Sequence, residues 1–217
     1  MNAPPDAVAV IVDISQSRSH ADRRELQDQI VAAFDRVNTL VAADQPLRAT
    51  VGDEFQAAYG DLGTALRATL LARLSLPEGV ECRFGLGLGE VATIGTGVAG
   101  VLQDGSAWWE ARKAIDEARR HQYSKLGFVR TWFRAAQPSP ADALVNGYLL
   151  GRDHIVGAMN PRARRLLLGQ LLGETQGTLA QQEGITQSAV SQNLARSGAN
   201  AVVAGETLLL ETTAVSG

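Results

Sequence analysis

The sequence has a single cysteine, no long apolar run and no excess of basic residues. Cys82 is the one cysteine among 217 residues, which excludes an internal disulfide and favours a reducing compartment. No segment reaches the ~20 apolar residues of a membrane-spanning helix. The first residues lack the basic and apolar regions of a signal peptide. We therefore expect a cytoplasmic protein that makes no contact with a membrane.

The chain also lacks a net positive charge. It has 20 Lys and Arg against 23 Asp and Glu, a formal charge of −3 and a pI of about 5.6. Any contact with DNA must therefore come from a local surface. Hydrophobic residues make up 45% and charged residues 20%, a composition that can form a globular core. The length allows one large domain or two smaller ones.

The stretch 47–60, LRATVGDEFQAAYG, predicts a β-hairpin with Gly52 and Asp53 at its tip. Asp53 and Glu54 then place two carboxylates side by side at the end of two apolar strands. Such a pair is compatible with binding Mg²⁺. A Gly-Asp step is equally ordinary turn chemistry, so both interpretations stay open on the residues alone.

A third carboxylate, Asp13, interrupts the apolar run 7–14, AVAVIVDI. The Val and Ile content of this run predicts a buried strand. A carboxylate at the end of such a strand costs desolvation energy unless another group pairs with it. Asp13 either caps the following loop or belongs to a metal or phosphate site at the end of the strand.

The segments between residues 7 and 134 alternate between strand and helix patterns. They predict an α+β fold, with an antiparallel or mixed sheet and helices on one of its faces. The expected segments are the strand 7–14, a helix from the N-cap Asp22 to Val41, the hairpin, a helix 62–74 ended by Pro77 and Gly79, the strand 81–90, a loop or short hairpin 94–105, a helix capped by Ser106, and the strand 127–134.

The strand 81–90, ECRFGLGLGE, places Gly85, Gly87 and Gly89 on one face. Glycine weakens a strand, so this face indicates that a helix, a partner subunit or a nucleotide packs very close to the backbone. The glycines are not a dinucleotide fingerprint, which requires a turn between a strand and a helix.

The motifs IVDISQSR, DR.ELQ, VGDEFQ, RFGLGLGE and QDG.AWWEARKAI resemble the SatD family over about residues 8 to 134. More distantly, they resemble class III nucleotidyl cyclases and GGDEF domains. The resemblance implies a ferredoxin-like sheet of the nucleotide-cyclase type with helices. It also implies that two aspartates hold metal ions against substrate phosphates, and Asp13 and Asp53 fall at those places. Mg²⁺ is the expected ion.

The same resemblance places the transition-state pair of the cyclases, an Asn and an Arg, on Trp108 and Arg112. Trp108 cannot replace an Asn that hydrogen-bonds ribose, and losing one such donor typically costs ~100 to 1,000-fold in rate. Ala49 occupies the place of the Lys that selects adenine in many adenylyl cyclases, and Val51 occupies the place of a second Gly in GGDEF enzymes. The departures argue against ordinary cyclase activity, with Arg112 the catalytic group if activity remains. The candidate contacts to a nucleotide are Ser15, Arg18, Trp108 and Arg112.

In the second half, the prolines of 137–140 predict a boundary. The expected division is a cyclase-like domain 1–136, a linker and bracing helix 137–159, and a small all-α domain 160–217. Residues 178–196 have the spacing of a helix, a turn at Gly184 and a second helix. They resemble a helix-turn-helix of the sigma-factor region 4 or MarR-like type.

In such a unit the start of the second helix contacts base edges in the major groove, and Gln pairs with adenine. Residues 160–197 contain four Arg and two Glu, a net charge of +2, so useful DNA affinity requires a homodimer. A helical hairpin for protein contacts is the alternative. The expected base contacts are Gln187, Ser188, Ser191 and Gln192, and the expected phosphate contacts are Arg196, Arg162, Arg164 and Arg165.

The leading hypothesis is a homodimeric DNA-binding transcriptional regulator whose degenerate cyclase-like domain senses a nucleotide or phosphorylated ligand. An active metal-dependent nucleotide enzyme and a protein-interaction scaffold are the alternatives.

Overall fold

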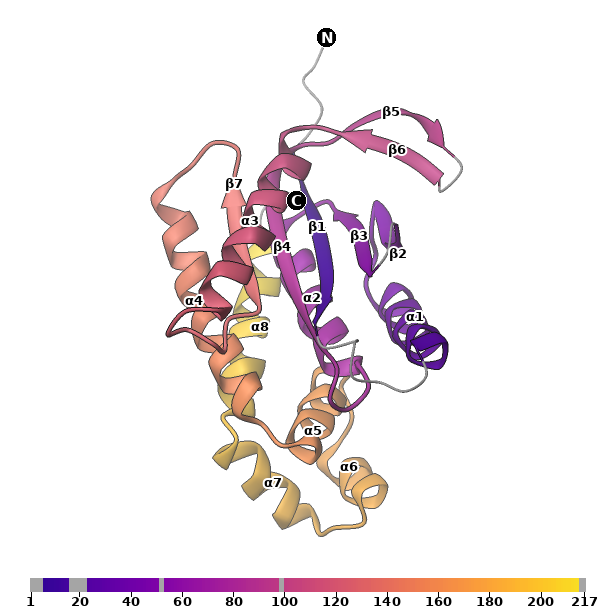
Figure 1. The fold of residues 1–217 in the computed structure, drawn as a ribbon. Helices are drawn as coiled ribbons and strands as arrows, with labels where there is room; N and C mark the ends of the chain where they lie inside the picture. Colours follow the sequence, from indigo (N-terminus) through magenta and orange to yellow (C-terminus); the bar gives the residue numbers. More distant parts are fainter. Residues whose placement is uncertain (1–5, 16–22, 51–52, 98–99, 215–217) are drawn as a thin grey trace. The chain divides into compact units, whose positions relative to one another are not determined.

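The computed structural model describes residues 6–15, 23–50, 53–97 and 100–214. The chain divides into two compact units, Met1–Leu150 and Gly151–Gly217, and the division falls within a helix, α4 (Pro140–Ala158). We describe each unit by itself (Figure 1).

The first unit contains a five-stranded sheet in the order β2-β3-β1-β4-β7. Only β7 runs parallel to its neighbour, β4. The first six elements follow the β-α-β-β-α-β order of ferredoxin-like folds, which confirms the predicted α+β class. Before α4 the elements are β1 (Asp6–Ser15), α1 (Arg23–Leu40), β2 (Gln45–Ala49), β3 (Glu54–Tyr59), α2 (Leu62–Ser75), β4 (Glu81–Glu90), β5 (Ala92–Gly97), β6 (Gly100–Asp104), α3 (Ser106–Gln122) and β7 (Thr131–Ala135).

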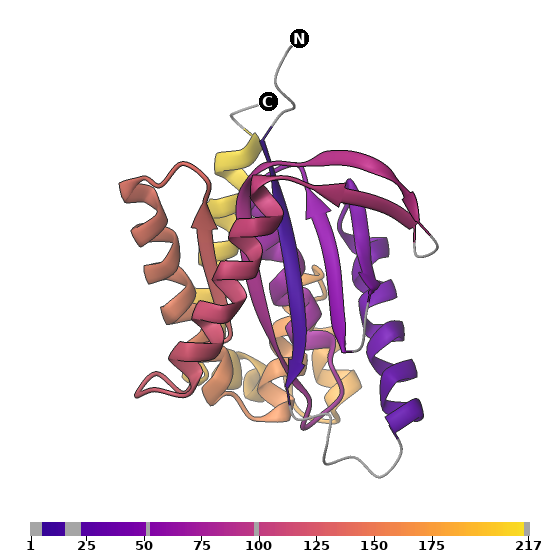
Figure 2. The same cartoon turned by 45° about the horizontal axis from the view of Figure 1, so that its top comes forward.

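Helices cover both faces of this sheet, whereas the sequence predicted helices on one face. Helices α1 and α2 lie on one face and α3 lies on the other, as Figures 1 and 2 show. Alternate residues of each strand point to opposite faces. Val10 and Phe84 therefore lie on the face covered by α1 and α2, while Ile11 and Gly85 lie on the face covered by α3. The strands β5 and β6 pair only with each other in a separate two-stranded sheet.

Helix α3 packs directly on the backbone of β4. A Cβ atom on Gly85 would overlap the carbonyl oxygen of Ala111, and one on Gly87 would overlap that of Ala107. The close neighbour predicted from the glycine face is therefore this helix. The helix is capped by Gly105, at φ +135°, and not by Ser106 as predicted. The Ser106 hydroxyl instead accepts a hydrogen bond from the backbone N–H of Glu90, at 3.0 Å.

Both edge strands of the sheet are closed by an asparagine side chain from a helix. Asn38 of α1 exchanges hydrogen bonds of 2.9 and 2.8 Å with the backbone carbonyl and N–H of Leu47 on β2. Asn146 of α4 does the same with Phe133 on β7, at 2.9 Å for both bonds. Each amide thus substitutes for a neighbouring strand at one residue, which limits the pairing of exposed edges with other chains.

The described residues of the second unit, 151–214, form helices and the turns between them. Besides the end of α4 it contains α5 (Pro161–Leu171), α6 (Gln176–Glu183), α7 (Gln187–Arg196) and α8 (Ala199–Ala214). Asn160 caps α5 and Thr186 caps α7, while Gly184 ends α6 in the left-handed conformation at φ +64°. The predicted start of α5 and the turn at Gly184 are confirmed. Among the described residues, no helix combines the length and apolar character needed to span a bilayer.

Gly87→Ala is expected to lower the free energy of unfolding of the first unit by about 1–3 kcal/mol or more, the usual cost of overpacking a core. Urea unfolding followed by tryptophan fluorescence measures it, because all three tryptophans lie in residues 1–150. Gly147→Ala in α4 is the matched control. A Cβ there meets nothing within 4 Å, so helix propensity should raise stability by about 1 kcal/mol. Equal destabilisation by both changes would contradict the close approach of α3.

Asn146→Ala is expected to destabilise the first unit by about 1–3 kcal/mol, because the N–H and C=O of Phe133 lose their partner. Size-exclusion chromatography with light scattering should also show more self-association, since the edge of β7 is opened. Gln137→Ala, which removes an exposed side-chain amide outside the helices and strands, should change stability by less than about 0.5 kcal/mol. An unchanged stability of Asn146→Ala would show that the edge does not depend on this amide.

Candidate functional site

Three charged residues form one row across the middle of the sheet. In the strand register, Asp13 of β1 lies opposite Glu54 of β3 on one side and Arg83 of β4 on the other. Residues that lie opposite one another point to the same face, here the face covered by α3. The row lies at the end of β1, where the sequence predicted a metal or phosphate site.

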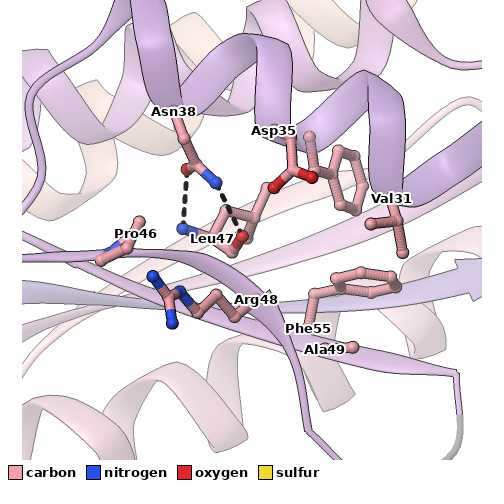
Figure 3. A pocket seen from close by; sticks show the side chains of 9 residues that line it. Val31, Asp35, Asn38, Pro46, Leu47, Arg48, Ala49 and Phe55 are labelled. Atoms are coloured by element: carbon pink, nitrogen blue, oxygen red, sulfur yellow. Dashed lines mark hydrogen bonds between the residues drawn. The ribbon is translucent and has the colours of Figure 1, made fainter.

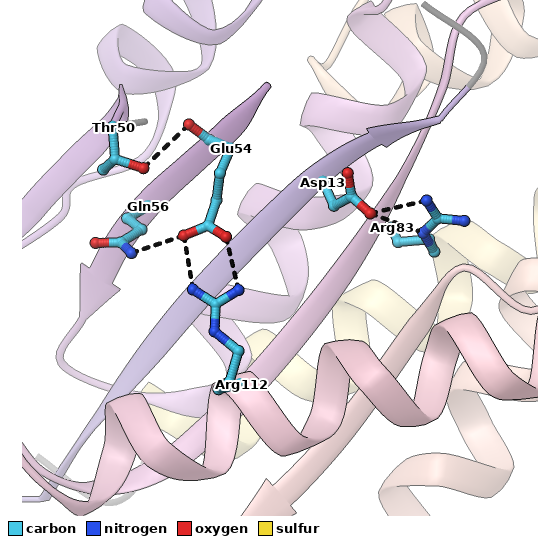
Figure 4. Close-up of polar contacts among 6 residues, drawn as sticks. All are labelled: Asp13, Thr50, Glu54, Gln56, Arg83 and Arg112. Carbon is cyan, nitrogen blue, oxygen red and sulfur yellow. Dashed lines mark hydrogen bonds and ion pairs between the residues drawn. The ribbon is translucent and has the colours of Figure 1, made fainter. Parts of the chain in front are cut away.

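Asp13 is paired with a buried arginine. Its Oδ2 accepts hydrogen bonds from Nη2 and Nε of Arg83 at 2.8 and 3.2 Å (Figure 4). Nη1 of Arg83 donates to Gln122 at 2.7 Å, and the arginine as a whole is 4% exposed. A buried guanidinium needs such a counter-charge. The local sequence patterns do not predict this partner, although the lone Arg within the apolar strand 81–90 was a signal for it.

Glu54 is held by the second arginine of the site, Arg112 of α3. Nη1 and Nη2 of Arg112 donate to the two carboxylate oxygens at 2.6 and 2.8 Å, and Gln56 donates to Oε1 at 2.9 Å (Figure 4). Burial alone would raise the pKa of Glu54, but the hydrogen bonds and charge of Arg112 outweigh it and lower that pKa. The hydrogen bonds from Arg112 to Glu54 raise the pKa of Arg112 in turn. Glu54 and Arg112 are therefore both charged at neutral pH.

The carboxylates of Asp13 and Glu54 are engaged by arginines in the structure. Oδ2 of Asp13 and both oxygens of Glu54 already accept hydrogen bonds from arginines. Asp53 lies beside the end of β1, since its carbonyl accepts a bond of 3.4 Å from the N–H of Ile14. Even so, among the described residues no group of three or more His, Cys, Asp or Glu is arranged to hold a metal ion. The arginines supply positive charge where the resemblance placed metal.

The two neighbouring tryptophans of α3 differ in exposure. Trp108 is 9% exposed and packs with Ala9, Ile11 and other residues of the core, which makes it a poor ligand contact. Trp109 is 60% exposed, and its Nε1 donates to Asp104 at 2.9 Å, so its indole is held in place at the surface. Of the other predicted contacts, Ser15 ends β1, whereas Arg18 lies outside the described residues.

Helix α7 presents a polar face and buries an apolar one. Val190 and Leu194 are 0% and 1% exposed, and Ala180 of α6 is buried as well. The five residues of α7 predicted to contact DNA are all exposed. They are Gln187, Ser188, Ser191, Gln192 and Arg196.

Two arginines predicted to contact phosphates are instead paired with Glu183, the last residue of α6. Arg165 donates to it at 2.6 and 2.8 Å, and Arg162 at 3.3 Å. The hydrogen bond from Arg165 is the largest cause of the lowered pKa of Glu183, with further contributions from its charge and from Arg162. Arg164 lies on the same helix, half-buried. Glu183 thus fixes the end of α6 against α5, a role that sequence spacing did not reveal.

Comparison with solved structures finds nucleotide cyclases. A bacterial light-regulated adenylyl cyclase is similar with a TM-score of 0.45 and 14% identity, over 59% of this chain and 75% of that one. The guanylate cyclase domain of RhGC from Catenaria anguillulae, in complex with GTP, is similar with a TM-score of 0.42 and 14% identity, over 54% and 75%. No curated protein matches the chain in sequence.

The family comparison covers much more of the chain. Residues 7–206 match the SatD family, a span that includes both the sheet with its row of charges and the helices α5 to α7. The motifs around Asp13, Asp53, the glycine strand and Arg112 lie inside this match. The chain belongs to the SatD family.

Proposed function

We propose that this protein is a homodimeric, cytoplasmic DNA-binding regulator that responds to a nucleotide or another phosphorylated ligand. The observation that carries the proposal is the polar, exposed face of α7, next to a glycine turn and a buried apolar face. This arrangement suits a recognition helix that enters the major groove of DNA.

The start of α7 offers the chemistry for reading bases. Gln187 and Gln192 can each form two hydrogen bonds with adenine, and Ser188 and Ser191 can bond to several base edges. Affinity must come largely from phosphate contacts, and here the charge is limited because Glu183 already pairs with Arg162 and Arg165. A second copy of the chain would double the number of contacts, which supports a dimer on DNA.

Helix α3 offers the chemistry for a nucleotide. Trp109 and Arg112 are three residues apart, so their side chains are neighbours on one helix surface. An exposed indole can stack on a base, and a guanidinium can bind phosphate in a bidentate manner. Arg112 is held by Glu54 in the structure, so a bound phosphate would have to compete with this carboxylate.

The two functions would be linked by a shift of conformational populations. A ligand changes DNA affinity only if it binds one arrangement of the two recognition helices more tightly than another. Release of Glu54 from Arg112 would be the local event that a phosphorylated ligand produces. The chemistry of the site requires no metal for this step, because two arginines face the carboxylates.

The DNA proposal predicts that Gln187→Ala with Gln192→Ala abolishes sequence preference while leaving weak, salt-sensitive binding. Each bidentate contact is worth about 1–3 kcal/mol of discrimination. The experiment is selection from random duplex DNA, followed by titrations of the selected sequence. Gln181→Ala with Gln182→Ala, two exposed glutamines of α6, is the matched control and should bind as the unchanged chain does. Failure to select any sequence would leave a protein-contact role for α6 and α7.

The nucleotide proposal predicts that ATP or GTP raises thermal stability even in the presence of EDTA, by about 2.7 kcal/mol at 100 times the dissociation constant. Arg112→Ala should weaken binding about 10- to 100-fold, since a charged hydrogen bond is worth about 1.5–3 kcal/mol. Trp109→Ala should weaken it through lost stacking, and Glu54→Gln should tighten it.

The control for this experiment is Arg120→Ala, which removes another exposed arginine of α3 that pairs with Glu117. It should leave nucleotide binding unchanged. Binding that requires Mg²⁺ and is lost in Asp53→Ala would contradict the arginine site. Turnover of ATP or GTP that depends on Mg²⁺ would favour the enzyme hypothesis, with Arg112 as its catalytic group.

A further inference from the structure

A separate groove of about 450 Å³ lies between α1 and the edge strand β2, on the face of the sheet opposite Arg112. Its volume falls within the range of small-molecule sites. Figure 3 shows that residues of α1 form one wall and residues of β2 the other. The lining residues are Val31, Phe34, Asp35, Asn38, Pro46, Leu47, Arg48, Ala49 and Phe55.

The floor of the groove is apolar and rigid. Phe34 and Phe55 are each 1% exposed, and their rings meet edge to face with centroids 4.8 Å apart. Leu47 is 4% exposed and lies within the irregular part of β2, where the register shifts between Gln45 and Arg48. These three side chains are already packed, so the apolar surface that the groove leaves open to a ligand is that of Val31, Pro46 and Ala49.

The side-chain amide of Asn38, on this floor, already forms hydrogen bonds within the protein. Both functional groups of the Asn38 side chain are bonded to the backbone of Leu47 (Figure 3). It therefore holds the strand in place and leaves recognition of a ligand to the other polar side chains of the groove.

Those side chains are two opposite charges on opposite walls. Asp35 stands on α1 and Arg48 on β2, and both are exposed (Figure 3). Neither side chain forms an ion pair with another described residue. A ligand that satisfies both must carry a positive and a negative group, with an apolar part for the floor.

We propose that this groove binds an α-amino acid with an apolar side chain. Its ammonium group would face Asp35, its carboxylate would face Arg48, and its side chain would lie against Val31, Pro46 and Ala49. The site is independent of the nucleotide and DNA proposals. The groove and the nucleotide site are adjacent in the sequence, because Phe55 of the groove follows Glu54, the partner of Arg112.

Isothermal titration of the full-length chain with four compounds tests each part of the proposal. L-Phenylalanine carries all three groups, 3-phenylpropionate lacks the ammonium, phenethylamine lacks the carboxylate, and glycine lacks the apolar part. L-Phenylalanine should bind most tightly. Each charged contact at an exposed site is worth up to about fivefold in affinity, so the two analogues that lack one charge should each bind weaker by up to that factor.

The variants assign each charge to its partner. Asp35→Asn should weaken L-phenylalanine and phenethylamine but not 3-phenylpropionate, and Arg48→Gln should do the reverse for the two analogues. Ala49→Trp should abolish binding by filling the groove. Ala32→Trp, an equally large change at an exposed position of α1 outside the groove, should leave it intact. No binding of L-phenylalanine at its highest soluble concentration, or binding that neither Asp35→Asn nor Arg48→Gln weakens, would overturn the proposal.

Discussion

The structure of residues 1–150 depends on the direct contact between the backbones of α3 and β4. A strand with side chains at Gly85 and Gly87 would hold the helix away from the sheet, since a Cβ at either position would overlap the helix backbone. The close approach brings Trp108 into the core beside Ile11. One turn later it brings Arg112 within reach of Glu54, a residue on the far side of β1.

The charges at the end of β1 follow from this packing. Asp13 and Glu54 lie opposite one another on adjacent strands, an arrangement that would be repulsive without counter-charges. Arg83 and Arg112 approach them from β4 and α3. Removing one partner of a buried ion pair typically costs about 3–5 kcal/mol, so the pair of Asp13 with Arg83 ties this site to the stability of the sheet. These arginines are why we favour a site for anions over one for metal ions.

Local patterns in the sequence were sufficient for the elements and for the positions of several candidate residues. Alternation in 81–90 predicted both the strand and a close neighbour on its glycine face, and Gly184 marked the turn between α6 and α7. The partners of these residues could not be predicted in the same way. Asp13 and Arg83 are 70 residues apart, and Glu54 and Arg112 are 58 apart. Such pairs are set by strand register and helix placement, which no local period encodes.

The choice between the two adjacent tryptophans of α3 was, by contrast, encoded in the helical spacing. Trp108 shares one face with Ala111, Ile115 and Ala118, which are all buried, whereas Trp109 lies on the face of Arg112. The basic residues of α5 predict phosphate contacts, but spacing along one helix does not reveal that Glu183 of α6 pairs with two of them.

The central claim is that ligand binding and DNA binding are coupled, and one measurement tests it directly. The affinity of the full-length chain for a selected DNA duplex would be measured by fluorescence anisotropy at fixed salt, with and without a saturating nucleotide. The account predicts a change of about 5- to 150-fold, the usual range of a coupling free energy of 1–3 kcal/mol. Identical affinity in both conditions, for a nucleotide shown to bind the chain, would contradict it.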